Sequence, residues 1–332
     1  MKQLNVAIIG FSLSGRVFHA PFLHTHPGFN LTKIVERSSQ KSKEIYSYIQ
    51  VVKNYQELLQ DDNLDLIVIG TPNTWHYPMV KESLLAEKHV VVEKPFTPTV
   101  KEADELIEIA RKVHRKIFVY HNRRWDGDFL TIQKLINEQK LGEIYEYEAH
   151  FDRFTPDLKN NWRDEDKAGS GVLYDLGSHL IDQAIQLFGL TKNVKSTIEA
   201  QRKNSPVDDY FRLELEYPHT KVILTAGMLV KELGPRFIVK GSKGQFIKYG
   251  IDPQEAALKE AQMPDTEDWG KEGKEHWGTL STNNSEMKIE TLAGNYMGFY
   301  DNVYEAIVNN EETFVKPEEA REVIRIIETA KK

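Results

Sequence analysis

Near its N-terminus the chain reads Leu4-Asn5-Val6-Ala7-Ile8-Ile9-Gly10-Phe11-Ser12-Leu13-Ser14-Gly15, an apolar run followed directly by a glycine-containing turn. A continuous apolar run of this length is typical of a strand that is buried on both faces of a parallel sheet. A helical pattern follows the turn. The stretch therefore predicts a strand, a tight turn and a helix in succession.

The first 120 residues repeat this alternation of strand and helix. Short apolar or β-branched runs predict further strands at residues 31–36, 66–69, 89–92 and 117–120. Helical spacing occupies residues 40–49, 55–60, 77–87 and 100–113, and the last of these follows a capping-box sequence from Thr99 to Glu102. Because crossovers between parallel strands are right-handed, the pattern predicts an N-terminal α/β domain with a doubly wound parallel sheet.

After Tyr120 the pattern changes to longer segments in which apolar and polar residues alternate. We expect a helix at residues 129–138, then strands at residues 144–151, 194–201, 209–216, 222–228, 236–240 and 245–249, with hairpin turns at residues 218–220 and 241–244. We expect a surface loop at residues 264–278 and two final helices at residues 295–309 and 317–331. The alternation predicts a C-terminal α+β domain with a large, mostly antiparallel open sheet. The predicted domains are residues 1–122 and 123–332.

Composition narrows the classes of partner. The chain has 332 residues, with 43 Lys and Arg against 50 Asp and Glu, and no long run of either sign. This balance argues against a nucleic-acid or anionic-lipid partner, since clustered basic residues usually hold such partners. No apolar run approaches the roughly 18 residues of a membrane span, and the first residues suit a buried strand better than a secretory signal. We therefore expect a cytoplasmic location.

Two observations bear on metals and on cysteine chemistry. The chain has no cysteine, which excludes disulfides, thiolate metal sites and cysteine nucleophiles. The histidines His19, His24 and His26 have no carboxylate at metal-ligand spacing. We expect no metal site.

The turn after the first strand matches a dinucleotide fingerprint in which Ser12 replaces the second glycine. Gly10 and Gly15 let backbone amides approach a pyrophosphate at a helix N-terminus, and Phe11 and Leu13 complete the turn. Taken alone, a plain strand-to-helix turn explains the motif equally well. Its place after the first strand of an alternating pattern favours a nucleotide cofactor.

The second strand ends in Glu36-Arg37-Ser38-Ser39, where such folds meet the adenosine ribose. A carboxylate there binds the ribose hydroxyls of NAD, whereas Arg37 and Ser38 suit the extra phosphate of NADP. We expect NADP to be preferred over NAD if Glu36 turns aside. A solvated charged turn is the alternative interpretation.

Polar residues also follow the next two strands. Thr71, Pro72 and Asn73 form a turn whose donors suit the nicotinamide side of a crevice, with His76 just beyond them; a simple turn and helix cap is the alternative. Glu93-Lys94-Pro95 comes at the adjacent strand end, which holds Lys94 near the same crevice. We expect Asn122, Trp162 and Arg163 to line this crevice, and Arg123 and Arg124 to be ion-paired at the domain junction.

A further candidate lies in the segment from Gly169 to Asp182. Asp175 and His179 stand four residues apart in an apolar, helix-periodic stretch, so one helical turn places both on one face. Alternatively, Asp175 caps a helix after Gly171, and His179 is an ordinary core or surface residue of the helix. Lysine, aspartate and histidine together can move a proton on and off a hydroxyl while a cofactor takes the hydride, so we expect Lys94, Asp175 and His179 to be catalytic. Asp182 is expected to be structural.

These motifs together resemble the Gfo/Idh/MocA family of NAD(P)-dependent oxidoreductases over essentially the whole chain. The resemblance is strongest to the NADP-dependent scyllo-inositol 2-dehydrogenase branch of that family, in four runs: residues 10–21, 120–126, 174–183 and 246–252. Two departures, Ser12 for glycine and Glu36 beside Arg37, bear on the cofactor preference alone.

The resemblance implies a Rossmann domain followed by a domain whose open sheet pairs with another subunit, giving a homodimer or homotetramer. It also implies that His179 exchanges a proton with the substrate hydroxyl, that Lys94 polarises that oxygen, and that Asp175 positions a neighbouring hydroxyl. We expect hydride transfer between the nicotinamide and a secondary hydroxyl or ketone of a cyclic polyol or sugar, scyllo-inositol first. The alternatives are a non-catalytic ligand sensor of the same fold and a sugar-ketone reductase of the same family.

Overall fold

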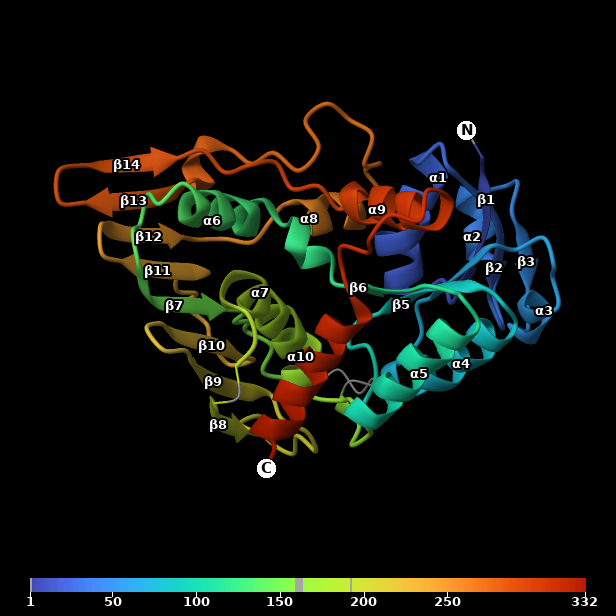
Figure 1. Ribbon diagram of the computed structural model, residues 1–332, viewed down its shortest axis with the longest axis horizontal. Coiled ribbons are helices and arrows are strands. Elements are labelled where there is room, and N and C mark those ends of the chain that lie inside the picture. The colour runs from blue at the N-terminus through green and yellow to red at the C-terminus, as the bar shows by residue number, and fades with distance from the viewer. Residues whose placement is uncertain (1, 159–163, 192) are drawn as a thin grey trace. The chain divides into compact units, whose positions relative to one another are not determined.

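The computed structural model describes residues 2–158, 164–191 and 193–332, which form two compact units, each with its own sheet (Figure 1). The first unit consists of Met1–Asn122, Gln254–Trp269 and Asn295–Arg321. The second consists of Arg123–Pro253, Gly270–Gly294 and Glu322–Lys332. The sequence predicted a single boundary at Asn122. It did not predict that the chain returns to the first unit twice, at Gln254–Trp269 and at Asn295–Arg321.

The first unit is built on a parallel sheet with the strand order β3-β2-β1-β4-β5-β6. The strands are β1 (Leu4–Ile9), β2 (Phe29–Val35), β3 (Gln50–Val52), β4 (Leu66–Ile69), β5 (His89–Glu93) and β6 (Ile117–Tyr120). All neighbouring strands pair in parallel, which confirms the predicted doubly wound sheet. Every residue of β4 and β6 is buried, because helices cover both faces. The short strand β3 was not predicted.

Among the described residues, seven α-helices belong entirely to this unit. They are α1 (Ala20–Thr25), α2 (Lys41–Ile45), α3 (Gln56–Leu59), α4 (His76–Leu85), α5 (Val100–Lys112), α8 (Gln254–Lys259) and α9 (Met297–Val308). The capping box before α5 is confirmed: Thr99 Oγ1 accepts from Glu102 N at 3.3 Å, and Glu102 Oε2 accepts from Thr99 N at 3.1 Å. Helix α2 is shorter than predicted, and α8 was not predicted.

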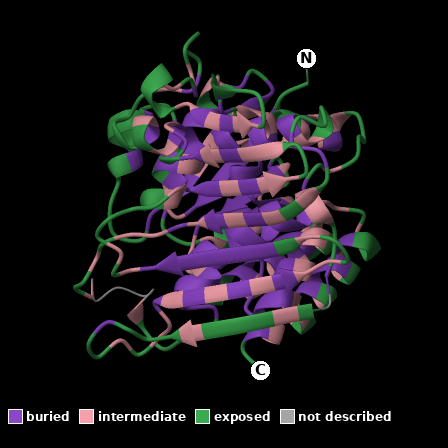
Figure 2. Cartoon of the chain, turned by 90° about the vertical axis from the view of Figure 1, so that its left-hand side faces the viewer, coloured by how far each residue is buried: buried purple, intermediate pink, exposed green. Residues whose placement is uncertain are grey.

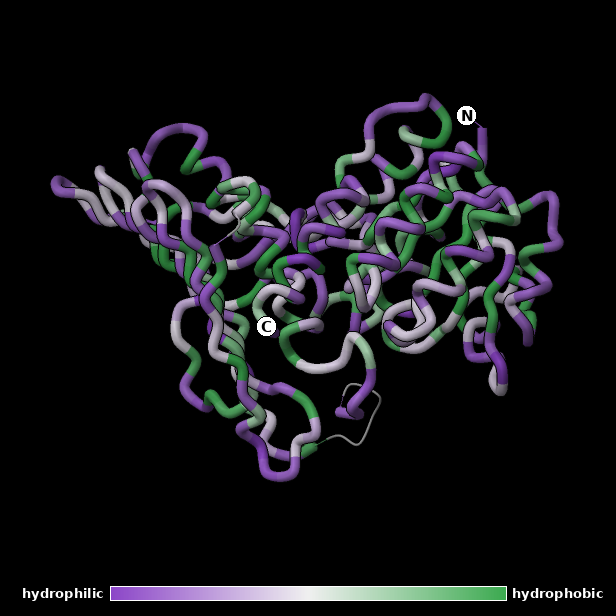
Figure 3. Tube along the Cα trace, turned by 60° about the horizontal axis from the view of Figure 1, so that its bottom comes forward, coloured by the Kyte–Doolittle hydropathy of each residue, from purple (hydrophilic) through white to green (hydrophobic). Residues whose placement is uncertain are grey.

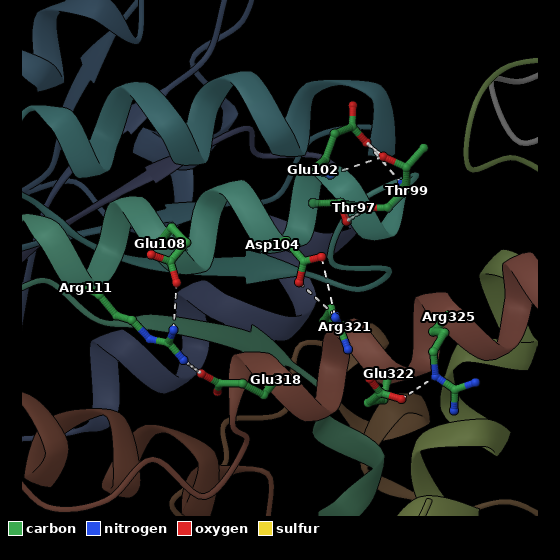
Figure 4. A network of polar contacts seen from close by, with 10 residues as sticks. All are labelled: Thr97, Thr99, Glu102, Asp104, Glu108, Arg111, Glu318, Arg321, Glu322 and Arg325. Carbon is green, nitrogen blue, oxygen red and sulfur yellow. Dashed lines mark hydrogen bonds and ion pairs between the residues drawn. The ribbon is translucent and has the colours of Figure 1, made fainter. Parts of the chain in front are cut away.

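Helix α10 (Pro317–Ala330) begins in the first unit, where its first two turns are ion-paired to α5 (Figure 4). Arg321 donates to Asp104 at 2.9 Å, and Arg111 donates to Glu318 at 2.9 Å. All four side chains are partly exposed, so solvent screens both pairs and each contributes little to stability.

The second unit is built on an eight-stranded sheet with the order β14-β13-β12-β11-β7-β10-β9-β8. The strands are β7 (Ile144–His150), β8 (Asn193–Glu199), β9 (Tyr210–Glu216), β10 (Lys221–Gly227), β11 (Phe237–Gly241), β12 (Gly244–Lys248), β13 (Gly278–Thr282) and β14 (Glu286–Ile289). Only β7 and β10 pair in parallel, which confirms a mostly antiparallel sheet with the two expected hairpins. Strands β13 and β14 were not predicted, and β14 has no buried residue that would give a strand signal.

The two faces of this sheet differ in burial. Along β9, buried residues alternate with half-buried ones, and Figure 2 shows similar banding on β11 and β12, whereas β10, beside β9, is buried along nearly its whole length. The buried face carries α6 (Gly127–Asn137) and α7 (Ser178–Phe188) (Figure 1), while hydrophilic residues gather at the loop tips (Figure 3). On the open face, Lys240 is ion-paired to Glu146 at 2.5 Å and to Glu148 at 3.1 Å.

None of the helices in the described part of the chain combines the length and the apolar character that crossing a membrane requires.

Candidate functional site

The turn after β1 can be made only with glycine at two positions. Gly10 has a φ of +95°, and a Cβ there would lie 3.0 Å from Gly70 O. A Cβ on Gly15 would lie 2.0 Å from Gly10 O, which no other residue can accommodate. Ser12 and Leu13 are exposed. A π-helical turn, Ser14–His19, then continues into α1, so a helix N-terminus faces the space over the turn, as an anion site requires.

Glu36, at the end of β2, is turned away from solvent and caps α2. Its carboxylate accepts from Ser42 N at 2.9 Å, from Lys41 N at 3.1 Å, and from the hydroxyls of Ser39 and Ser42. Burial raises the pKa of Glu36, but these hydrogen bonds outweigh it and leave the pKa below its ordinary value. The next two residues, 37 and 38, remain exposed.

His76 ties together the turns that follow β4 and β5. Its ring is fully buried, with Nδ1 2.8 Å from Pro95 O and Nε2 3.0 Å from Thr71 O. Burial lowers the pKa of His76, so the ring is neutral and donates to one of the two carbonyls. Asn73 is also buried and opens the short helical turn that leads into α4. Pro72 and Thr71 are half-buried beside it.

A buried network holds the end of β5. Glu93 Oε1 accepts from Ser14 Oγ at 2.5 Å and from His19 Nε2 at 3.1 Å, while Oε2 accepts from Lys94 N at 3.2 Å. On its other side, His19 Nδ1 lies 2.7 Å from the hydroxyl of Tyr300. Burial raises the pKa of Glu93, but the bonds from His19 and Ser14 and the Lys94 charge lower it to about 2. A carboxylate thus joins the glycine turn to the strand end that carries Lys94.

The sequence interpretation missed the roles of His19 and Tyr300. It considered His19 only as a possible metal ligand, yet its partners lie 74 and 281 residues away. No local spacing signals such contacts. In the ranges that the structure describes, no group of three or more His, Asp or Glu side chains is arranged to hold a metal ion.

In the second unit, Asp175 and His179 lie on one helical segment. A π-helical turn, Leu173–Gly177, runs directly into α7. The cap of this segment is Asp208, whose Oδ2 accepts from Leu173 N at 2.7 Å. Asp175 N donates to Gly171 O at 3.0 Å, so Asp175 lies inside the helix and the capping alternative is wrong. Asp175 is half-buried, and His179 is 6% exposed with its ring centroid 6.4 Å from that of Phe151.

The expected ion pair of Arg124 is confirmed. Arg124 Nε and Nη2 donate to the two carboxylate oxygens of Asp182 at 2.9 and 2.7 Å, and both side chains are buried. Arg123 pairs with Asp126 at 3.2 Å. These contacts give Asp182 the structural role that was expected.

The remaining candidates fall into three places. Those of the first unit, residues 10–15, 36–38, 71–76, 93–94 and 122, all follow the carboxyl ends of β1, β2, β4, β5 and β6 at one edge of one sheet. Asp175 and His179 belong to the second unit. Trp162 and Arg163 lie outside the described residues.

A doubly wound parallel sheet whose glycine turn follows β1, where the strand order reverses, defines a dinucleotide-binding protein. Residues 4–121 match the family model of the oxidoreductase family NAD-binding Rossmann fold, and residues 133–332 match that of the C-terminal alpha/beta domain of the same family. The chain belongs to the Gfo/Idh/MocA family of oxidoreductases. It is an enzyme of that family with an NAD-binding domain.

Three relatives show how far the similarity extends. The chain is 41% identical to the oxidoreductase YdgJ of Escherichia coli, over 98% of this chain and 95% of the relative. It is 40% identical to scyllo-inositol 2-dehydrogenase (NADP(+)) IolW of Bacillus subtilis, over 99% of this chain and 93% of the relative. The solved structure of the oxidoreductase yvaA from Bacillus subtilis superposes with a TM-score of 0.96 at 38% identity, covering 99% of this chain and 95% of that one.

Proposed function

We propose that this protein is an NADP-preferring dehydrogenase that transfers a hydride between the nicotinamide and a secondary hydroxyl or ketone of a cyclic polyol or sugar. The observation that carries the proposal is the combination of Lys94, Asp175 and His179 in a chain 40% identical over nearly its whole length to a scyllo-inositol 2-dehydrogenase. A ligand sensor has no need for this set of proton-transfer groups.

The chemistry follows from what these side chains can do. A bound nicotinamide cofactor supplies the hydride acceptor or donor. As carbonyl character develops at the substrate carbon, the hydroxyl proton passes to a ring nitrogen of His179, since imidazole exchanges protons near neutral pH. The ammonium group of Lys94 stabilises the negative charge that develops on the oxygen. Asp175 accepts a hydrogen bond from a neighbouring hydroxyl and thereby orients the ring.

The preference for NADP rests on the direction of Glu36. An NAD-binding carboxylate must reach the ribose hydroxyls, but the Glu36 carboxylate is already occupied by the amides and hydroxyls at the start of α2. Arg37 and Ser38 stay exposed at the same strand end, where a guanidinium and a hydroxyl suit a phosphate. The NADP(+) dependence in the name of IolW agrees with this assignment.

Replacing Arg37 by alanine is expected to weaken NADPH binding about 10- to 100-fold, the value of a charge-assisted hydrogen bond, and to leave NADH binding within about twofold. Isothermal titration calorimetry with each cofactor measures both constants. Lys43→Ala, which removes an exposed cation from α2, is the matched control. An equal loss for both cofactors would show that Arg37 does not contact the extra phosphate.

The activity itself is tested by nicotinamide absorbance against a panel of inositols and sugars, with NAD and NADP supplied separately. We expect reversible, NADP-dependent turnover with a cyclic polyol. Turnover with an open-chain or sugar ketone alone would identify the sugar-ketone reductase. Tight NADPH binding without turnover of any member would favour the ligand sensor.

We also propose that the open face of the eight-stranded sheet pairs with a second copy of the chain. Ile238 and Ile247 lie half-buried on this face among its ion pairs, so part of their apolar surface is open to a partner. Light scattering after gel filtration is expected to give a dimer or tetramer. A charge placed at the centre of the face, as in Ile238→Lys, should shift the mass towards the monomer.

A further inference from the structure

Three guanidinium groups gather around one aromatic ring in the second unit. The Cζ atoms of Arg236, Arg123 and Arg153 lie 4.4, 4.8 and 5.2 Å from the ring centroid of Phe151. The same ring lies 6.4 Å from the ring of His179. A cluster of positive charge therefore gathers around an aromatic ring that lies near the imidazole that we propose as the proton acceptor.

In the described part of the chain, two of these cations have carboxylate partners and the third does not. Arg123 is ion-paired to Asp126 at 3.2 Å, and the buried Arg236 interacts electrostatically with Asp128. Arg153 is half-buried, and none of the carboxylates in the described ranges pairs with it. Because like charges repel, gathering a third, unneutralised cation at this ring is unfavourable for the protein alone. An anion that binds beside Arg153 would offset the repulsion among the three guanidinium groups.

The backbone places Arg153 on the face of the sheet that carries α7. After β7 ends, the chain stays extended, since Arg153 N donates to Gly227 O at 2.9 Å and Val230 N donates to Arg153 O at 3.0 Å. Alternate residues of an extended chain share a face, so Arg153 follows Phe151 on the side of His179. Asp152 points the other way, with Oδ1 accepting from Gly227 N at 2.9 Å and Oδ2 3.5 Å from His150 Nδ1.

Stacking on Phe151 leaves the hydrogen-bonding edge of Arg153 available. A guanidinium that lies over an aromatic ring keeps its N–H groups in its own plane, where they can meet a ligand. These donors match two oxygens of a carboxylate or phosphate in geometry as well as in charge. Phe151 thus holds the group in place without using its donors.

We propose that Arg153 binds an oxyanion of the substrate, the carboxylate of a sugar acid or the phosphate of a sugar phosphate, while the reacting hydroxyl lies at His179. This inference rests on the proposed function and narrows its substrate class. Neutral polyols would then be slower substrates that lack one anchoring contact.

The test compares substrates that differ only in the group at one ring carbon: glucose, glucuronate and glucose 6-phosphate. We expect kcat/KM to be at least about tenfold higher for one of the two charged sugars, which also distinguishes carboxylate from phosphate. Arg153→Met, which keeps a long side chain on Phe151, should remove this preference and lower kcat/KM for the charged sugar about 10- to 100-fold, with glucose and scyllo-inositol nearly unchanged. Lys203→Met removes an exposed cation from another loop of this unit and serves as the matched control.

A binding measurement separates this inference from the proposed function. Calorimetric titration of the NADPH-bound protein with glucuronate and with inorganic phosphate should show binding that Arg153→Met abolishes, whether or not turnover occurs. If neutral polyols turn over but Arg153→Met affects charged and neutral substrates alike, the oxyanion site is wrong and the dehydrogenase stands. If nothing turns over while Arg153-dependent binding persists, the dehydrogenase is wrong and the site stands. Absence of both oxyanion binding and the charge preference overturns the site.

Discussion

Substitution of His179 by alanine is expected to lower kcat about 10²- to 10⁴-fold, the usual contribution of a general acid–base group, while the Kd for NADPH changes little. The reason is that the hydroxyl proton loses its acceptor, whereas His179 is not among the residues that we propose to contact the cofactor. Lys94→Ala should lower kcat by a similar factor, because the developing negative charge on the oxygen loses its cation. Steady-state kinetics on the substrate found in the panel, with calorimetry for NADPH, measures both quantities.

His150→Ala is the matched control for His179, since His150 is half-buried on the opposite, open face of the same sheet. We expect its kcat to stay within about threefold of the original. If the His179→Ala variant is as active as the His150→Ala variant, His179 is not the group that accepts the hydroxyl proton. A loss of NADPH binding in His179→Ala would point instead to a folding defect.

Replacement of Glu93 by glutamine is expected to reduce the free energy of unfolding by about 3 kcal/mol at pH 7. The carboxylate loses its charge while Ser14 Oγ, His19 Nε2 and Lys94 N still point at it as donors. The lowered pKa of Glu93 leads to a similar loss of unfolding free energy. A fall of the pKa from 4.5 to about 2 corresponds to roughly 3 kcal/mol at 1.36 kcal/mol per pKa unit.

The direction of the Glu93 pKa shift determines how its contribution to stability depends on pH. Because the pKa of Glu93 is lower in the folded protein than in the unfolded chain, its contribution is complete above about pH 4.5 and is lost as the pH falls towards 2. Denaturant unfolding at several pH values should show a gap between the original protein and Glu93→Gln that narrows over this interval. Glu44→Gln, an exposed carboxylate on α2, should stay within about 0.5 kcal/mol throughout. A gap that is constant from pH 7 to pH 2.5 contradicts the charged network.

The strands that the amino-acid sequence predicts well are those with a strong local signal. β4, β5 and β6 are apolar runs in which nearly every side chain is buried, and hydrophobic burial alone is enough to specify them. The short strand β3 and the exposed strand β14 have no such run. They form because a neighbouring strand already presents free backbone donors and acceptors, which is a property of the assembled sheet.

The same division applies to the candidate site. The sequence by itself determined the glycine positions of the turn after β1, the strand ends that carry Glu36 and Lys94, and the spacing of Asp175 and His179, since each depends on neighbouring residues along the chain. Only the tertiary structure decided that Glu36 caps α2, that His19 and Tyr300 support Glu93, and that none of the described carboxylates pairs with Arg153 beside Phe151. These features depend on which side chains come into contact in the folded chain and which charges form ion pairs. Local sequence spacing cannot specify them, because several of the contacts join residues tens or hundreds of positions apart.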